Sequence, residues 1–99
     1  MNFKELQRIM PGLIGEMAAD VTLDAESEMD EFVILSHEGD VFDGDIPRFV
    51  YYKSDHPDLL NHISVLVNEG FVSTVSDGSP PIYRMKKGFR SLLVSAQKP

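Results

Sequence analysis

The first twenty residues carry apolar side chains at alternating spacings of three and four, which is the pattern of one face of a helix. This stripe consists of Phe3, Leu6, Met10, Leu13 and Met17. Pro11 interrupts it, because proline lacks a backbone N–H and clashes with the carbonyl four residues before it. We therefore expect either a kinked helix or two short helices over residues 1–20. The stripe would face the domain's own core or, alternatively, form a seam in a homodimer.

Residues 21–53 combine acidic, polar stretches with two short apolar runs. Residues 32–35 are apolar, partly β-branched and followed by a glycine turn, so they are expected to form a buried strand. Residues 49–52 also have a high strand propensity. The sequence Asp-Ile-Pro before them can equally begin a short helix, because proline is favoured at the first helical position. For residues 46–53 both alternatives stay open.

The pattern is clearest from residue 54 to residue 70, where it predicts one amphipathic helix. Ser54 or Asp55 can cap its beginning, and Pro57 suits its first turn. Gly70 suits the position just after its end. The apolar face is expected to comprise Leu59, Leu60, Ile63, Leu66 and Val67.

Residues 71–85 are expected to form a hairpin, with strands over residues 71–75 and 82–85 joined by a turn rich in Gly, Ser and Pro. A closing amphipathic helix over residues 86–97 is indicated by Phe89, Leu92, Leu93 and Ala96. The chain of 99 residues is therefore predicted to be a single α+β domain.

The order of helix, glycine, strand, Asp-Gly turn, strand and helix is the order of a winged helix. Residues 83–93 resemble the wing-to-helix junction of the multiple-antibiotic-resistance and phenolic-acid-decarboxylase repressor families. There an aromatic-basic-apolar triplet ends the second wing strand, and a polar pair, a glycine and an amphipathic helix follow. Residues 66–72 likewise resemble the end of their recognition helix. The resemblance covers about 45 residues and implies a winged helix with an additional N-terminal helix.

Two features depart from the pattern of those families. Lys86 stands where they usually have threonine. Their recognition helix also follows a short helix, and no such helix can be identified before Ser54. The resemblance therefore implies the wing and the recognition-type helix more directly than the first half of a helix-turn-helix.

Charge is unevenly distributed along the chain. Residues 1–45 contain twelve acids and two bases, whereas residues 46–99 contain four acids and seven bases. The net charge of −7 argues against nucleic acid as a partner, because phosphate contacts supply most non-specific affinity. The positive half, however, contains the winged-helix pattern. The acidic stretch would be a solvated face or a surface for a basic partner.

Helix 57–69 and the wing are the expected contact surface. Amide and hydroxyl side chains on this helix are suited to pair with base edges in a groove, although no Lys or Arg lies on it. The candidate contact residues are Asn61, His62, Ser64, Val65, Asn68, Asp77, Gly78, Arg84, Lys86, Lys87 and Arg90. The leading hypothesis is a small regulator that contacts nucleic acid. The alternative is an adaptor that binds another protein through the helix, the wing and the acidic half.

The sequence predicts neither an enzyme nor a cofactor or metal site. There are no cysteines, and His37, His56 and His62 are too scattered for a convincing set of metal ligands. Residues 40–45 partly resemble a calcium loop but miss its alternating acids and distal glutamate. No apolar run approaches the roughly 20 residues that cross a bilayer. We therefore expect a cytoplasmic protein without membrane contact.

Overall fold

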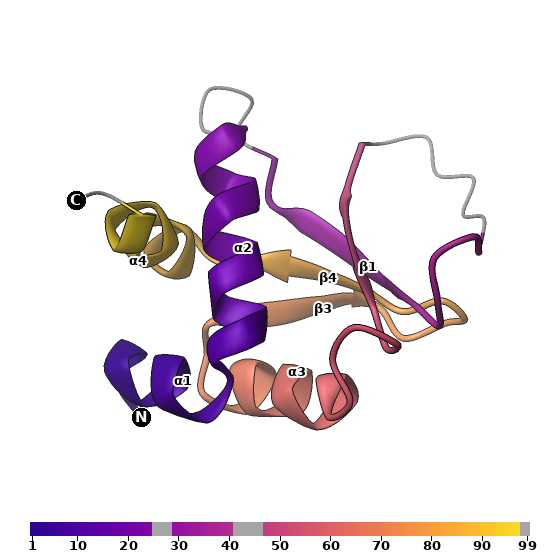
Figure 1. Ribbon diagram of the computed structural model, residues 1–99, viewed down its shortest axis with the longest axis horizontal. Coiled ribbons are helices and arrows are strands. Elements are labelled where there is room, and N and C mark those ends of the chain that lie inside the picture. Colours follow the sequence, from indigo (N-terminus) through magenta and orange to yellow (C-terminus); the bar gives the residue numbers. More distant parts are fainter. Residues whose placement is uncertain (25–28, 41–46, 98–99) are drawn as a thin grey trace.

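Four helices and a four-stranded mixed sheet make up the part of the chain that the computed structural model describes, residues 1–24, 29–40 and 47–97. This confirms the predicted α+β class. Helix α2 crosses in front of the sheet, α4 lies beside α2, and α3 lies at one end of the sheet (Figure 1). The elements are α1 (Phe3–Ile9), α2 (Pro11–Leu23), β1 (Glu31–Leu35), β2 (Phe49–Tyr52), α3 (Leu59–Asn68), β3 (Val72–Ser76), β4 (Ile82–Met85) and α4 (Lys87–Gln97).

The N-terminal region forms two helices that meet at Pro11, which was one of the two expected arrangements. Asn2 caps α1 by accepting a hydrogen bond from the Glu5 N–H at 2.9 Å. Met10 ends α1 and begins α2, with Pro11 in the first turn of α2, where its missing N–H costs nothing. The second helix runs three residues beyond the predicted end at residue 20.

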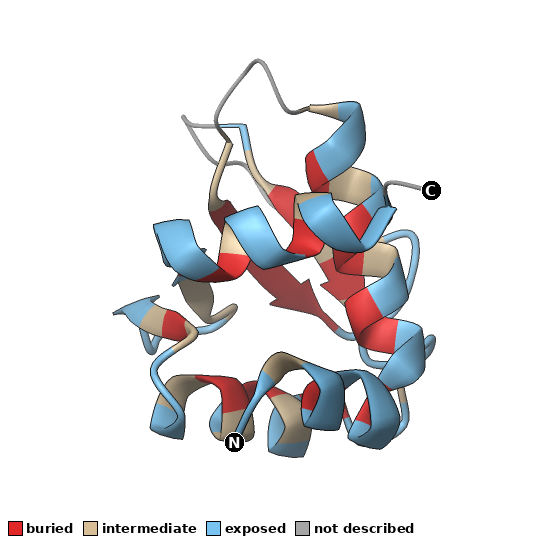
Figure 2. Cartoon of the chain, turned by 90° about the vertical axis from the view of Figure 1, so that its left-hand side faces the viewer, coloured by how far each residue is buried: buried red, intermediate tan, exposed pale blue. Residues whose placement is uncertain are grey.

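The apolar stripe of these two helices faces the domain's own core. Its residues Leu6, Met10, Leu13 and Met17 are at most 1% exposed, and Phe3 packs against them. Figure 2 shows the same division, with buried residues on the helix sides that face the sheet and exposed residues on the outer sides. The positions that were the alternative candidates for a homodimer seam are therefore occupied by intramolecular packing.

The sheet has the order β2-β1-β4-β3. Strands β1 and β2 are parallel, and the other two pairs are antiparallel. Residues 36–48 connect β1 to β2, which fits the dozen or so residues that a parallel connection needs. The predicted strand over residues 32–35 is confirmed, and residues 49–52 are a strand rather than a helix.

Strand β2 bears on the winged-helix prediction, because it stands where a helix-turn-helix has its first helix. None of the described residues between β1 and α3 is helical. Instead, residues 49–52 add a parallel strand to the edge of the sheet. The antiparallel pairing of β1 with β4 and of β4 with β3 adds a third strand to the β3–β4 hairpin.

Helix α3 begins at Leu59, so the predicted cap at Ser54 or Asp55 was wrong. His56 precedes Pro57, and a residue before proline is disfavoured in the helical conformation. The chain therefore continues in turns, with the N–H of Asp55 donating to the Tyr52 carbonyl and that of Leu59 to the His56 carbonyl, both at 3.0 Å.

The inner face of α3 is narrower than predicted. Leu59, Ile63 and Leu66 are at most 1% exposed, but Leu60 is 45% exposed, so its assignment to the apolar face was wrong. One residue turns a helix by about 100°, which carries Leu60 from the buried line to its flank. Val67 is half-buried, and so is Val65, which had been expected to point outward; both pack against the core.

Gly70 ends α3 as predicted. Its φ of +82° lies in the left-handed region. The N–H of Gly70 donates to the Val67 carbonyl at 3.1 Å, and that of Phe71 donates to the Leu66 carbonyl at 2.9 Å. These two bonds form a Schellman motif, which satisfies the last carbonyls of the helix.

Replacing Gly70 by alanine is expected to lower the free energy of unfolding by about 1 kcal/mol. This is the cost of placing a residue with a Cβ atom in the left-handed region of backbone conformation. The added Cβ meets nothing within 4 Å, so backbone strain alone sets this cost. Gly15 is the matched control, because it is exposed, lies inside α2 and also has open space around a Cβ. Gly15→Ala is expected to stabilise by about 0.5 to 1 kcal/mol. Urea denaturation measures both changes. If both variants changed the free energy of unfolding in the same direction, backbone strain at Gly70 would not be the cause.

The hairpin and the closing helix lie within one residue of their predicted bounds. Strand β3 runs over Val72–Ser76, one residue later than predicted, and its pairing with β4 shifts register between Thr74 and Ser76. Helix α4 buries Phe89 and Leu93. The Phe89 ring packs against Phe3 of α1 at 6.3 Å and against Phe71 at 5.4 Å, centroid to centroid.

Candidate interaction surface

The outward side of α3 carries short polar side chains and one large apolar one. Leu60, Asn61, Ser64 and Asn68 are exposed, and we call these four residues the α3 surface. His62 is half-buried beside it. The Ser64 hydroxyl donates to the Leu60 carbonyl at 3.1 Å and is therefore partly engaged with its own helix. Of the predicted contact residues on this helix, Asn61, Ser64 and Asn68 are exposed, while His62 and Val65 are half-buried and Val65 packs against the core.

Two hollows adjoin the beginning of α3 and meet at the segment Pro57-Asp58. One, of about 280 Å³, is lined by Lys53 and by residues 57–61, which include Leu60. The other, of about 270 Å³, lies between α3 and the corner where α1 meets α2. It is lined by Ile9, Met10, Pro11, Gly12, Leu13, Asp55, His56, Pro57, Asp58 and His62. The exposed apolar side chains Ile9 and Leu60 therefore each border a hollow.

One of the predicted basic contact residues, Arg84, is engaged inside the domain together with Arg48. Arg84 lies opposite Glu31 across β1 and β4, and its Nη2 is 2.6 Å from Glu31 Oε2. Arg48 Nε donates to the other oxygen of Glu31 at 3.0 Å. Glu31 itself is only 8% exposed. Arg84, and then Arg48, lower the pKa of the Glu31 carboxyl against the opposing effect of burial.

The Arg90 side chain donates hydrogen bonds to backbone carbonyl groups at and just after the C-terminal end of α2. Its Nη2 donates to the Asp24 carbonyl and its Nε to the Met29 carbonyl, both at 3.2 Å. A cation is favoured there, because the carboxyl end of a helix carries partial negative charge. Lys86 and Lys87 are exposed at the junction of β4 and α4. Among the described basic residues of the C-terminal half, Lys53 lines the hollow beside Leu60, whereas Arg84 and Arg90 are engaged within the domain.

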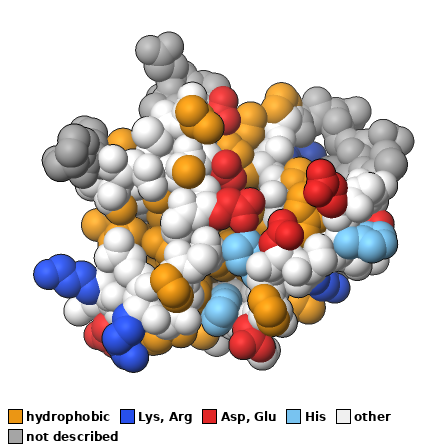
Figure 3. All heavy atoms as spheres, viewed as in Figure 1, with side chains coloured by type: hydrophobic (Ala, Val, Ile, Leu, Met, Phe, Trp, Pro, Cys, Tyr) orange, Lys and Arg blue, Asp and Glu red, His pale blue; other side chains and the backbone are white. Residues whose placement is uncertain are grey.

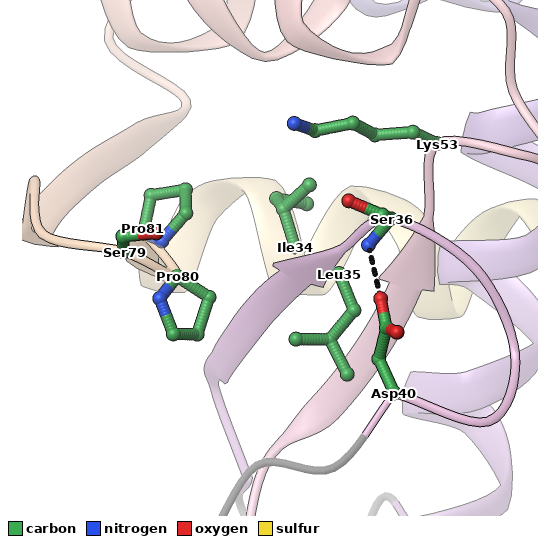
Figure 4. Close-up of a pocket in the computed structure, with 8 residues that line it drawn as sticks. All are labelled: Ile34, Leu35, Ser36, Asp40, Lys53, Ser79, Pro80 and Pro81. Carbon is green, nitrogen blue, oxygen red and sulfur yellow. Dashed lines mark hydrogen bonds between the residues drawn. The ribbon is translucent and has the colours of Figure 1, made fainter.

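The turn between β3 and β4, residues 77–81, carries no basic residue. Asp77 and Gly78 are exposed, and the Gly78 N–H donates to the Ser76 hydroxyl at 3.3 Å. A third hollow lies between the β3–β4 turn and the end of β1, floored by Ile34 and Leu35, with Lys53 reaching over it (Figure 4). Its carboxylate, Asp40, already accepts the N–H groups of Ser36 and His37 at 3.1 Å.

A cluster of ionisable groups that sequence reasoning missed lies between α2 and β2. We call Glu16, Asp20, Tyr51 and His56 the α2 cluster. His56 Nε2 is 2.6 Å from Glu16 Oε1, which joins the segment before α3 to α2. Figure 3 shows acidic side chains over α2 in the middle of this face, with histidines next to them. The spacing of Glu16 and Asp20 was a signal, but Tyr51 joins them only through the placement of β2, and His56 only through the turn before Pro57.

Tyr51 and Asp20 influence one another inside this cluster. Tyr51 is fully buried, and its hydroxyl has no hydrogen-bond partner of ordinary geometry among the described residues. Burial and the nearby charges of Asp20 and Glu16 raise the pKa of the Tyr51 hydroxyl far above its ordinary value. Burial also raises the pKa of Asp20, and the Tyr51 hydroxyl partly offsets this.

The described part of the chain brings no three metal-ligating side chains together. Most of the segment that partly resembles a calcium loop, residues 41–45, lies outside the described residues. Among the helices that are described, none combines the length and apolar character needed to span a membrane. No protein-family model, curated protein or solved structure matches the chain.

Proposed function

We propose that the chain is a protein-interaction domain that binds a segment of another protein across the α3 surface and the two hollows beside it. The observation that carries this proposal is the exposed leucine at the centre of the region. Leu60 is 45% exposed and Ile9 is 38% exposed, and each borders a hollow next to Pro57. Exposed apolar side chains that border a hollow and are surrounded by polar groups match the apolar core and polar rim of a protein interface.

Electrostatics favour protein over nucleic acid as the partner. Phosphate contacts need accessible Lys or Arg side chains close to the reading helix. Here Arg84 bonds Glu31 and Arg90 bonds backbone carbonyls, while α3 itself has neither Lys nor Arg. The acids Asp55 and Asp58, which line the hollow near Ile9, would face a phosphate backbone with like charge.

The winged-helix relationship belongs to the same proposal. The order α3, Gly70, β3, β4 and α4 supports it, as does the antiparallel pairing of β1 with β4. Strand β2 is the departure, since it stands directly before the recognition-type helix. We infer a winged-helix variant in which a strand replaces the first helix, and whose second helix is used for protein contact.

Replacing Leu60 by aspartate is expected to reduce capture of the partner protein at least tenfold, because losing an apolar anchor costs about 1 to 3 kcal/mol of binding. A photo-crosslinking amino acid at position 61 in the full chain would report the contact, and mass spectrometry of the product would identify the partner. Because Leu60 is exposed, the free energy of unfolding should change by less than about 0.5 kcal/mol.

Leu92→Asp is the matched control, since Leu92 is 39% exposed but lies on α4. It should leave the crosslinking yield unchanged. Equal losses in the two variants would contradict the proposed surface. So would binding of a labelled random-sequence DNA duplex, measured by fluorescence anisotropy at about 50 mM salt, that weakens steeply with salt and is lost in Lys86→Ala.

A further inference from the structure

We propose that Glu16 and Asp20, with Tyr51 behind them, form a receptor site for a basic side chain of the protein that docks on the α3 surface. This inference rests on the proposed function and names the chemistry of the partner. Arginine and lysine share that chemistry, since each presents a cation with several N–H donors. No described Lys or Arg of the chain itself forms an ion pair with Glu16 or Asp20.

The first argument is the fixed position of Glu16. Its Oε1 is 2.6 Å from His56 Nε2, and the His56 side chain is only 13% exposed. The ring is also held against α2, with Nδ1 3.8 Å from where a Cβ would lie on Gly12. One carboxylate oxygen of Glu16 is therefore occupied, while the side chain is 36% exposed and leaves the other oxygen for a ligand.

The second argument is the pairing of Asp20 with Glu16 on one side of α2. Residues four apart lie one above the other on a helix, with Cβ atoms about 6 Å apart. Asp20 is half-buried, and the charges of Glu16 and Asp24 oppose its ionisation in addition to burial. A cation between the two carboxylates removes that repulsion and donates hydrogen bonds to both.

The third argument is the Tyr51 hydroxyl, the one buried side-chain polar atom among the described residues that makes no hydrogen bond of ordinary geometry. Such groups call for an explanation in a native structure. The Tyr51 hydroxyl favours the ionised form of Asp20 and lowers the pKa of that carboxyl against the effect of burial. When a bound cation holds Asp20 in the ionised form, Tyr51 has a charged acceptor for its proton. Tyr51 is thus a positioning residue that acts through Asp20.

The site is continuous with the proposed docking surface. His56 contacts Glu16 on one side and lines the hollow that contains Ile9 and Pro57 on the other. A segment anchored at Leu60 and Ile9 therefore has this cluster at its edge. Asp55 and Asp58 line the same hollow, and the face that receives the segment is acidic. Charge complementarity calls for a partner segment with apolar anchors and a basic residue.

The test uses the full chain and two small probes, N-acetyl-arginine amide and its neutral isostere N-acetyl-citrulline amide. Amide chemical shifts are followed by NMR during titration. The arginine probe should produce saturable shifts at residues 16–20 with a dissociation constant on the order of millimolar. The citrulline probe should produce none there. Asp20→Asn should weaken the arginine probe at least tenfold. Asp77→Asn, which removes an exposed acid at the wing tip, should have no effect.

Tyr51→Phe separates a positioning role from a structural one. This variant should weaken the arginine probe about threefold and raise the pKa of the Asp20 carboxyl, followed through its side-chain carbon resonance, because the hydroxyl that favours the ionised form is lost. An unchanged pKa and unchanged affinity would overturn the role of Tyr51. Shifts that do not saturate, that persist in Asp20→Asn or that the citrulline probe reproduces would overturn the site.

The two proposals fail separately. Neither probe needs the partner protein, so the two tests are independent. If neither probe binds but Leu60→Asp loses crosslinking, the cation site is overturned and the proposed function stands. Probe binding that is lost in Asp20→Asn, together with equal crosslinking in Leu60→Asp and wild type, would support the cation site and overturn the docking surface.

Discussion

Replacing Phe89 by alanine is expected to lower the free energy of unfolding by about 3 to 5 kcal/mol. The ring is 1% exposed and packs against Phe3 of α1 and against Phe71, which lies between α3 and β3, so its removal leaves a cavity between these parts of the core. Neither aromatic neighbour can fill this space without leaving its own contacts, and tightly packed interiors relax only partly. Urea denaturation measures this loss of stability as a lower midpoint of unfolding, and the slope of the transition should stay unchanged.

Leu92→Ala on the same helix is the control for this experiment. Leu92 is 39% exposed, and we expect its truncation to cost less than about 0.5 kcal/mol. A loss below 1 kcal/mol in Phe89→Ala would mean that α4 does not close the core as described. Phe89 also bears on function, because Phe71 directly follows α3 and Phe3 belongs to α1. Its packing therefore anchors the two elements that border the proposed docking surface.

The second half of the fold was predictable because its signals are local. Gly70 ends a helix through its own backbone conformation, and Phe89 and Leu93 lie at a helical spacing that needs no knowledge of the rest of the chain. The alternation of propensities around the Asp-Gly turn likewise indicates two paired strands. Such features depend on neighbours within a few residues, and they were correct to within one or two positions.

The fate of residues 49–52 could not be predicted in the same way. Their strand exists because β1 offers a parallel partner, with Val50 in register with Val33 and Tyr51 with Ile34. That pairing is a long-range choice that local propensity does not encode. The late start of α3, in contrast, depends on a local signal, because Pro57 disfavours a helical conformation at His56. The prediction gave more weight to Ser54 and Asp55, which are good capping residues.

The α2 cluster shows why the candidate site was only partly predictable. Glu16 and Asp20 are visible in the sequence as an acidic pair, but an acidic pair on a helix is ordinarily solvated. Only the placement of β2 brings the Tyr51 hydroxyl behind them, and only the turn before Pro57 brings His56 to Glu16. Leu60 could not be assigned from the sequence either. Its position in the helical repeat is compatible both with the face that packs on the core and with the exposed flank of that face.

Replacing Glu31 by glutamine is expected to lower the free energy of unfolding at neutral pH by about 1 to 3 kcal/mol, the range for charge-assisted hydrogen bonds. Glu31 is 8% exposed and receives Arg84 at 2.6 Å and Arg48 at 3.0 Å. Glutamine keeps the shape but loses the charge that both guanidinium groups face. The Arg84 side chain is 49% exposed, so solvent screens the Arg84–Glu31 ion pair. The loss in free energy of unfolding is therefore expected to be smaller than for a fully buried ion pair.

The pH dependence identifies the charge as the cause. Arg84, and then Arg48, lower the pKa of Glu31 in the folded protein below its value in the unfolded chain. The stabilisation is therefore complete above the unfolded pKa of about 4.3 and is lost as the pH falls through the folded pKa. Wild type and Glu31→Gln should differ at pH 7 and converge in acid.

Asp30→Asn is the matched control for Glu31, because Asp30 is the adjacent acid and is 3.8 Å from the same Arg84. Its side chain is 42% exposed, so we expect a change within about 0.5 kcal/mol and little effect on the pH profile. Equal losses in the two variants, or a difference between wild type and Glu31→Gln that persists in acid, would show that shape rather than charge is responsible. Because Glu31 joins β1 to β4 and to the residue before β2, the outcome also reports how firmly the parallel strand β2 is held to the rest of the sheet.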